Sequence, residues 1–153
     1  MQYIESAKQP DDGPCVFCAL LDGLPGEPPR ILHRATFAWI TLAKFPYNPG
    51  HLLVLPVRHI GDVEDLTNEE NAEIGSLVQK AVRALREESA PHGFNVGLNL
   101  GSVAGAGIPD HLHWHIVPRW SGDTNFMPVV GETRIVPELL ADTFRRLAPR
   151  FER

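Results

Sequence analysis

The sequence predicts an α+β fold in which a β-sheet is covered on one face by a long helix. Two segments, residues 94–100 and 111–116, carry apolar side chains at every second position, which is typical of strands with one apolar face. From Thr67 onward the apolar positions follow helical spacing instead. Because strands and helix each have one apolar side, we expect them to pack against each other.

The first strands are expected in residues 31–42 and 51–57, which are rich in β-branched, aromatic and leucine side chains. Between them, residues 44–50 contain two prolines and a glycine, which favour a turn. This part of the chain therefore predicts a strand, a turn and a second strand. Two further segments rich in proline and glycine, 24–29 and 104–109, are expected to be loops.

The long helix has clear signals at both ends. Thr67 and Glu70 have the spacing of a capping box, and Pro91 with Gly93 predicts the end of the helix. Between these points the apolar stripe consists of Ile74, Leu77, Val78, Ala81, Val82 and Leu85. A second, C-terminal helix is expected at roughly 137–147, with weaker periodicity.

Composition indicates an ordinary globular protein. The chain has 153 residues, long enough for a single domain spanning 1–153, and 43% of them are hydrophobic. A formal net charge of −5, with 14 scattered basic residues, disfavours binding to nucleic acid. No apolar run approaches the roughly 20 residues of a membrane span, and the N-terminus does not resemble a signal peptide. We therefore expect no membrane partner and a cytoplasmic location.

Three histidines, His111, His113 and His115, alternate with apolar residues in the last predicted strand. The period of a strand would place three imidazoles in a row on the face opposite the helix. Neutral imidazole is a good nucleophile toward phosphorus, and most histidines with an ordinary pKa of about 6.5 are neutral at pH 7. The alternative is a solvated strand face, or a histidine cluster held by structural hydrogen bonds.

Cys15 and Cys18 have the C-x-x-C spacing. This spacing suits two thiolate ligands of a tetrahedral zinc ion, with histidine the expected source of the other ligands. Two other interpretations remain open, a pair of small buried cysteines or a thioredoxin-like redox motif, although the preceding residues do not resemble the strand that the redox motif requires.

Two further histidines and one loop are weaker candidates. His51 and His59 flank the second predicted strand, where each could equally make a structural hydrogen bond. Residues 101–108 contain three glycines and lead into the histidine strand, so backbone amides could converge there on an anion. A plain flexible loop is the alternative.

Together these segments resemble the histidine-triad (HIT) family over nearly the whole chain. The matching features are Pro49, Gly50 and His51 before a strand, the long helix, and the H-x-H-x-H motif followed by Val117, Pro118 and Arg119. The resemblance implies a HIT-like fold with an antiparallel sheet of about five strands, and a homodimer. It divides the chain into an N-terminal zinc-binding segment at about 10–25, a core at about 30–120 and a C-terminal extension at about 121–153.

The resemblance also implies roles for site residues. His113 would attack the α-phosphate and form a nucleotidyl-histidine intermediate, His115 would hydrogen-bond the phosphate or leaving oxygen, and His51 would brace the triad strand. We expect substrate contacts from Asn99, from Asn48 and from the loop residues Gly105, Ala106 and Gly107.

Zinc-bearing relatives imply a structural Zn²⁺ site in this chain. Its ligands would be Cys15, Cys18, His59 and His111. Such a site would tie the N-terminal segment to the histidine strand.

Residues 94–101 and 118–126 resemble the bacterial diadenosine tetraphosphate phosphorylase branch of the family. This resemblance implies an enzyme that cleaves dinucleoside polyphosphates, with water or orthophosphate as acceptor. A nucleoside phosphoramidate hydrolase or nucleotidyl transferase would use the same nucleophile. A zinc-stabilised nucleotide-binding module without turnover is the alternative outside enzymes.

Overall fold

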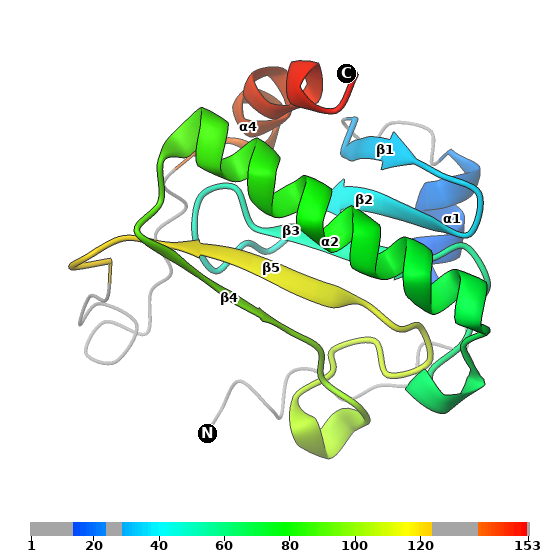
Figure 1. The fold of residues 1–153 in the computed structure, drawn as a ribbon. Coiled ribbons are helices and arrows are strands. Elements are labelled where there is room, and N and C mark those ends of the chain that lie inside the picture. Colours follow the sequence, from blue (N-terminus) through cyan, green and yellow to red (C-terminus); the bar gives the residue numbers. More distant parts are fainter. Residues whose placement is uncertain (1–13, 24–28, 124–137, 153) are drawn as a thin grey trace.

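The computed structural model describes residues 14–23, 29–123 and 138–152. Within these ranges five strands form one antiparallel sheet in the order β1-β2-β3-β5-β4 (Figure 1). The strands are β1 Ile31–Arg34, β2 Ala38–Leu42, β3 Leu52–Pro56, β4 Gly93–Gly97 and β5 Trp114–Arg119. The helices are α1 Val16–Asp22, α2 Asn68–Ser89 and α4 Leu140–Leu147, with 3-10 turns η1 Val63–Asp65, η2 Ser102–Ala104 and η3 Ala148–Arg150. The predicted α+β architecture is confirmed.

The long helix α2 begins at the predicted capping box. The Thr67 hydroxyl accepts a hydrogen bond from the Glu70 amide, and the Glu70 carboxylate accepts one from the Thr67 amide (2.8 Å). These two bonds satisfy backbone donors that have no partner within the first helical turn. The helix ends at Ser89, and Ala90 follows in the left-handed conformation.

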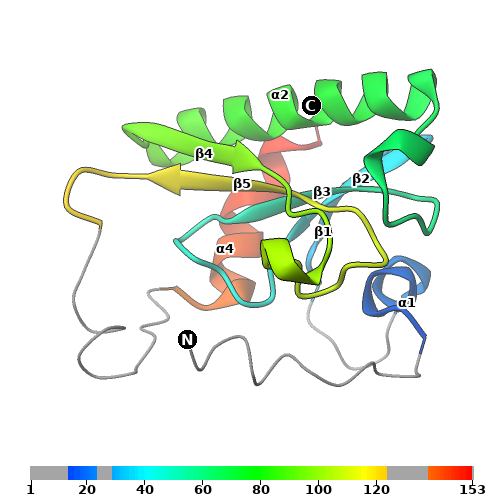
Figure 2. The same ribbon diagram turned by 90° about the horizontal axis from the view of Figure 1, so that it is seen from below.

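Helices cover both faces of the central strands, with α2 on one side and α1 on the other (Figure 2). All five residues of β2 and all five of β3 are buried for this reason. Ile40, Leu52 and Val54 pack with α2, while Trp39, Leu53 and Leu55 pack with Phe17 and Leu20 of α1. The run Leu52 to Leu55 is continuously apolar because both faces of β3 lie in the core.

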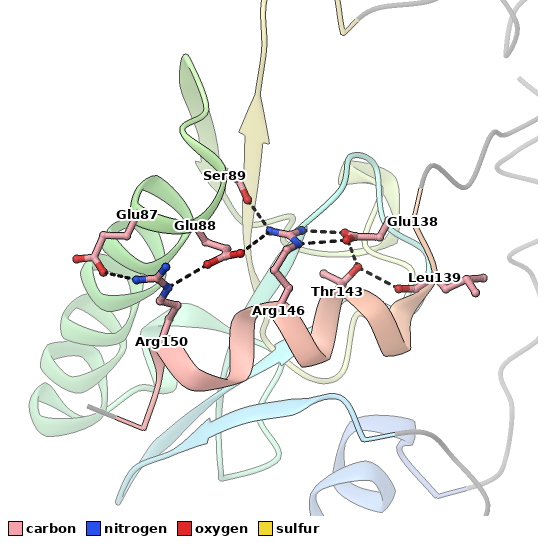
Figure 3. A network of polar contacts seen from close by, with 8 residues as sticks. All are labelled: Glu87, Glu88, Ser89, Glu138, Leu139, Thr143, Arg146 and Arg150. Carbon is pink, nitrogen blue, oxygen red and sulfur yellow. Dashed lines mark hydrogen bonds and ion pairs between the residues drawn. The ribbon is translucent and has the colours of Figure 1, made fainter.

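The C-terminal helix α4 begins at Leu140, later than predicted, and Pro137 lies outside the described residues. Leu147 and Phe151 join the core beneath α2. Ion pairs add to this contact, because Arg146 and Arg150 both bind Glu88 of α2 (3.7 and 3.0 Å) (Figure 3).

Several predicted boundaries are wrong. Residues 31–42 form a hairpin, because the chain turns at residues 35–37 and the carboxylate of Glu73 accepts hydrogen bonds from the amides of Phe37 and Ala38. The histidine strand begins at Trp114, because the Leu112 amide donates to Ile60 (2.7 Å) and draws the preceding residues away from the sheet. Strand β4 stops at Gly97 instead of residue 100, and the helix α1 was not expected.

None of the helices in the described part of the chain is long and apolar enough to cross a membrane. The extent of the domain, 1–153, stays a prediction, because parts of that range lie outside the described residues.

Candidate active site and metal centre

Four histidine rings lie in a row on the side of the sheet opposite α2. His113 and His115 have ring centroids 5.0 Å apart, and His115 is 5.1 Å from His51, which stands just before β3. His111 lies beyond His113, and Phe17 of α1 packs against both rings at 5.6 and 5.2 Å. The expected grouping on one face is thus present, although His111 and His113 precede the strand.

The ring of His113 is oriented by the main chain. Its Nδ1 lies 2.8 Å from the carbonyl oxygen of His111. A carbonyl oxygen only accepts hydrogen bonds, so Nδ1 carries the proton and Nε2 has a free electron pair. Burial also lowers the pKa of His113, opposed by this hydrogen bond. A neutral imidazole with an unprotonated Nε2 is the form that can act as a nucleophile.

His51 and His115 are arranged as a donor pair. The Tyr47 amide donates to Nδ1 of His51 (3.1 Å), so His51 carries its proton on Nε2. This Nε2 lies 3.0 Å from Nδ1 of His115 and donates to it, which places the proton of His115 on its own Nε2. The result is an imidazole N–H beside His113.

Burial keeps both rings of this pair neutral. Burial, together with the charges of His115 and His113, lowers the pKa of His51 to about 3. Burial and the neighbouring His113 lower the pKa of His115 to about 4. His51, His113 and His115 are therefore uncharged at neutral pH, and the position of the proton on each ring decides which nitrogen donates and which accepts.

Sequence reasoning missed the contribution of Tyr47. Its ring stacks on His51 at 4.8 Å and on His115 at 5.8 Å, while 53% of the residue stays exposed. The turn before β3 thus supplies both His51 and an aromatic ring that stacks on His51 and His115. No local pattern in the sequence signals this stacking.

Cys15, Cys18, His59 and His111 form a second cluster, in which one ligand atom from each lies within 4.8 Å of all the others. Nδ1 of His111 lies 3.4 Å from the Cys15 sulfur, 3.6 Å from the Cys18 sulfur and 3.4 Å from Nδ1 of His59. Tetrahedral zinc with bonds of about 2.0–2.3 Å separates its ligands by roughly 3.3–3.8 Å. These four residues could therefore hold a tetrahedral metal ion.

The main chain also prepares His111 for this cluster. Its Nε2 lies 3.0 Å from the carbonyl oxygen of Pro56, so Nε2 carries the proton and Nδ1 is available as a ligand atom. Burial and the neighbouring Cys15 raise the pKa of the Cys18 thiol. A bound cation would offset the free-energy cost of having two thiolates close together.

Three of the five expected substrate contacts, Asn48, Gly105 and Ala106, make hydrogen bonds within the protein. Asn48 donates its side-chain amide to the Pro118 carbonyl (2.9 Å) and to the Asp123 carboxylate (2.8 Å). In the 101–108 loop, the amides of Gly105 and Ala106 donate to Ser102 and Gly101. The hydrogen bonds of Asn48, Gly105 and Ala106 therefore stabilise the turn and the loop, whereas Gly107 is exposed.

A cavity of about 630 Å³ opens beside His115. It lies between the turn that carries Tyr47 and Asn48 and the exposed side of β4, and it extends past Asn99. Its far end contains the ion pair between Arg119 and Asp123 (2.6 Å), which sequence reasoning did not identify.

Comparisons with known proteins agree with this geometry. Residues 28–122 match the model of the HIT domain. The AP-4-A phosphorylase of Mycobacterium tuberculosis is 47% identical over 130 residues, which cover 85% of this chain and 67% of that protein. The adenosine 5'-monophosphoramidase of Schizosaccharomyces pombe is 32% identical over 105 residues, 69% of this chain and 74% of that protein.

Solved structures show the same fold. A zinc-bound histidine triad family protein from Mycobacterium smegmatis has a TM-score of 0.72 and 30% identity, covering 90% of this chain and 93% of that one. A HIT family member from Bacillus subtilis has a TM-score of 0.66 and 28% identity, covering 90% of this chain and 97% of that one.

Proposed function

Because this chain belongs to the histidine-triad (HIT) family, we propose that it cleaves dinucleoside polyphosphates, diadenosine tetraphosphate first among them, through a nucleotidyl intermediate on His113. The expectation of a nucleotide-processing enzyme agrees with the 47% identity to AP-4-A phosphorylase. Its substrate is a small nucleotide, since the formal net charge of −5 disfavours nucleic acid.

The opposite tautomers of two adjacent rings are the observation that carries the proposal. Nε2 of His113 has a free electron pair, and Nε2 of His115 has a proton. In the first step Nε2 of His113 bonds to the α-phosphorus while the bond to the leaving oxygen breaks, and His115 donates a hydrogen bond to the charge that develops. In the second step water or orthophosphate displaces His113 from phosphorus. His51 holds His115 in the required tautomer.

The metal cluster supports a structural role for Zn²⁺, held by Cys15, Cys18, His59 and His111. When bound, zinc would crosslink α1 to the segment that precedes β5 and would take no part in the chemistry. The zinc-bound relative from Mycobacterium smegmatis supports the choice of metal.

Two further expectations belong to the proposal, that the protein acts in the cytoplasm and that it forms a homodimer. The edge strand β4, where 48% of Val96 is exposed, is the surface we propose for the dimer contact. Light scattering on the purified protein tests the dimer.

Turnover of diadenosine tetraphosphate, with and without orthophosphate, tests the activity. His113→Ala removes the nucleophile, and His92→Ala, a histidine outside both clusters, is the matched control. ADP plus ATP formed only with phosphate would identify a phosphorylase, and AMP plus ATP a hydrolase. Products at equal rates from wild type and His113→Ala would contradict the proposed mechanism.

A second candidate is an adenosine phosphoramidate hydrolase, which the 32% identity to the monophosphoramidase favours. Faster release of AMP from adenosine 5'-phosphoramidate than turnover of the tetraphosphate would select it. Nucleotide binding without any turnover would instead select the binding-module alternative.

A further inference from the structure

The cavity beside His115 has no assigned occupant in the reaction described above. Its volume of about 630 Å³ falls within the range of roughly 300–1,000 Å³ typical of small-molecule sites. One orthophosphate ion would leave most of this space empty. The cavity is therefore of a size to hold a nucleoside.

The position of the cavity relative to the nucleophile indicates which part of a substrate reaches it. Phe17 packs against the ring of His113 on the side of α1, and His115 lies next to His113 toward the cavity. His115 itself lines the cavity, and the hydrogen bond between its Nδ1 and His51 leaves its proton on Nε2. A group that leaves phosphorus with a hydrogen bond from His115 would therefore extend into the cavity.

The cavity wall has no side chain at Gly97, the position opposite His115. In the β4–β5 pairing Gly97 lies directly across from His115, and Asn95 lies across from Val117. A Cβ atom added at Gly97 would meet nothing within 4 Å. The absence of a side chain here keeps a path open from His115 to Asn95.

The walls combine an aromatic ring with uncharged polar groups. Tyr47 lines the cavity with an exposed ring that can stack on a base. At the far end Arg119 donates hydrogen bonds from both Nε and Nη2 to the carboxylate of Asp123 (2.6 and 2.7 Å), so this ion pair adds no net charge to the cavity. Arg119 also donates to the side-chain oxygen of Asn95 (2.7 Å), which leaves the Nδ2 group of Asn95 as a donor.

We propose that this cavity is the subsite for the nucleoside of the leaving nucleotide, with Tyr47 as the stacking surface and Asn95 as the residue that hydrogen-bonds the base or ribose. The inference rests on the proposed nucleotidyl transfer, because it assigns the second half of a dinucleoside polyphosphate. A neutral, partly aromatic cavity suits a nucleoside better than it suits a free anion.

Binding measurements test the subsite independently of turnover. Isothermal titration compares AMP with a methylene-bridged, non-hydrolysable analogue of diadenosine tetraphosphate. The variants are Asn95→Ala, which removes the donor, and Gly97→Val, which adds a side chain where a Cβ atom would meet nothing within 4 Å. Asn71→Ala, on the exposed side of α2, is the matched control.

The wild-type protein should bind the analogue more tightly than AMP, and the ratio of these affinities should fall roughly tenfold in Asn95→Ala and Gly97→Val, but not in Asn71→Ala. An unchanged ratio in both variants, or a wild type that binds the two ligands equally, would overturn the subsite. If the affinity ratio is unchanged but a variant has a smaller mass in solution than wild type, the cavity is part of a contact between subunits. This result would also overturn the subsite. Turnover of the tetraphosphate by wild type separately tests the proposed function.

Discussion

His111 contacts two functional clusters with two different parts of one residue. Its imidazole faces the sulfur of Cys15 at 3.4 Å, and its carbonyl oxygen accepts the Nδ1 proton of His113 at 2.8 Å. The group that orients the proposed nucleophile therefore belongs to a residue of the candidate metal cluster. Loss of the metal should change the position of His113 as well as the stability of the fold.

Replacement of one metal ligand tests this connection. His59→Asn should lower the zinc content of the purified protein, lower its melting temperature and reduce kcat, because His111 would lose its fixed position. Metal analysis, thermal unfolding and turnover give the three readouts, with His92→Asn as the matched histidine control. A chelator should lower the melting temperature of wild type more than that of His59→Asn. Full zinc content in His59→Asn would contradict the assigned ligand set.

The buried His51 should make stability depend on pH. Its pKa in the folded protein is about 3, against an ordinary value near 6.5. Below pH 6.5 the unfolded chain takes up a proton that folded His51 does not, so the free energy of unfolding falls as the pH falls toward 3, by at most about 1.4 kcal/mol per pH unit. His51→Asn should show a shallower fall than wild type.

Urea unfolding at pH 7, 6 and 5 measures this difference. His92→Asn, at an exposed position, should follow the wild-type slope. Equal slopes for wild type and His51→Asn would show that His51 takes up its proton at the ordinary pH in the folded protein.

Gly50 should not tolerate a side chain. Its φ is +78°, and an added Cβ would lie 3.0 Å from a methyl carbon of Leu85. Gly50→Ala should lower the free energy of unfolding by about 1–3 kcal/mol and reduce turnover, because His51 follows directly. Gly75→Ala, in α2 with nothing within 4 Å, should raise it by about 0.5–1 kcal/mol. Similar effects at the two positions would contradict the described turn.

The ion pairs of Arg146 should hold the C-terminal helix in place. Its guanidinium contacts Glu138, Glu88 and Ser89 with 29% of the side chain exposed (Figure 3). Arg146→Ala should lower the free energy of unfolding by about 1–3 kcal/mol. Arg145→Ala removes a 76% exposed side chain paired with Asp142 and should cost less than about 0.5 kcal/mol. Chemical denaturation of the two variants should separate them.

Local signals predicted the elements that local interactions define. The capping box at Thr67 and Glu70 and the apolar stripe that follows predicted α2, because helical contacts lie three and four residues apart. The prolines and glycine of residues 44–50 predicted the turn before β3. In contrast, α1 has seven residues and no side-chain hydrogen bond at its N-terminus, so the sequence offered no such signal.

Contacts between distant residues determined what was missed. The hairpin turn at residues 35–37 is held by Glu73, and the strand β5 starts late because Leu112 pairs with Ile60. The histidine motif predicted a cluster, but only the structure assigns a separate tautomer to each ring. The tautomers of His111 and His115 depend on Pro56 and His51, which lie 55 and 64 residues away along the chain.

The partners that orient His111, His113 and His51 are a carbonyl oxygen of Pro56, a carbonyl oxygen of His111 and the amide of Tyr47. Peptide groups do not ionise, so these three partner groups keep the same polarity in acid and in base, which a carboxylate would not. The side chains of the residues that supply them are also free of this task. A substitution at Pro56 or Tyr47 would change packing but would keep the carbonyl oxygen or the amide nitrogen that orients the ring. The tautomer of each ring therefore depends on the path of the backbone.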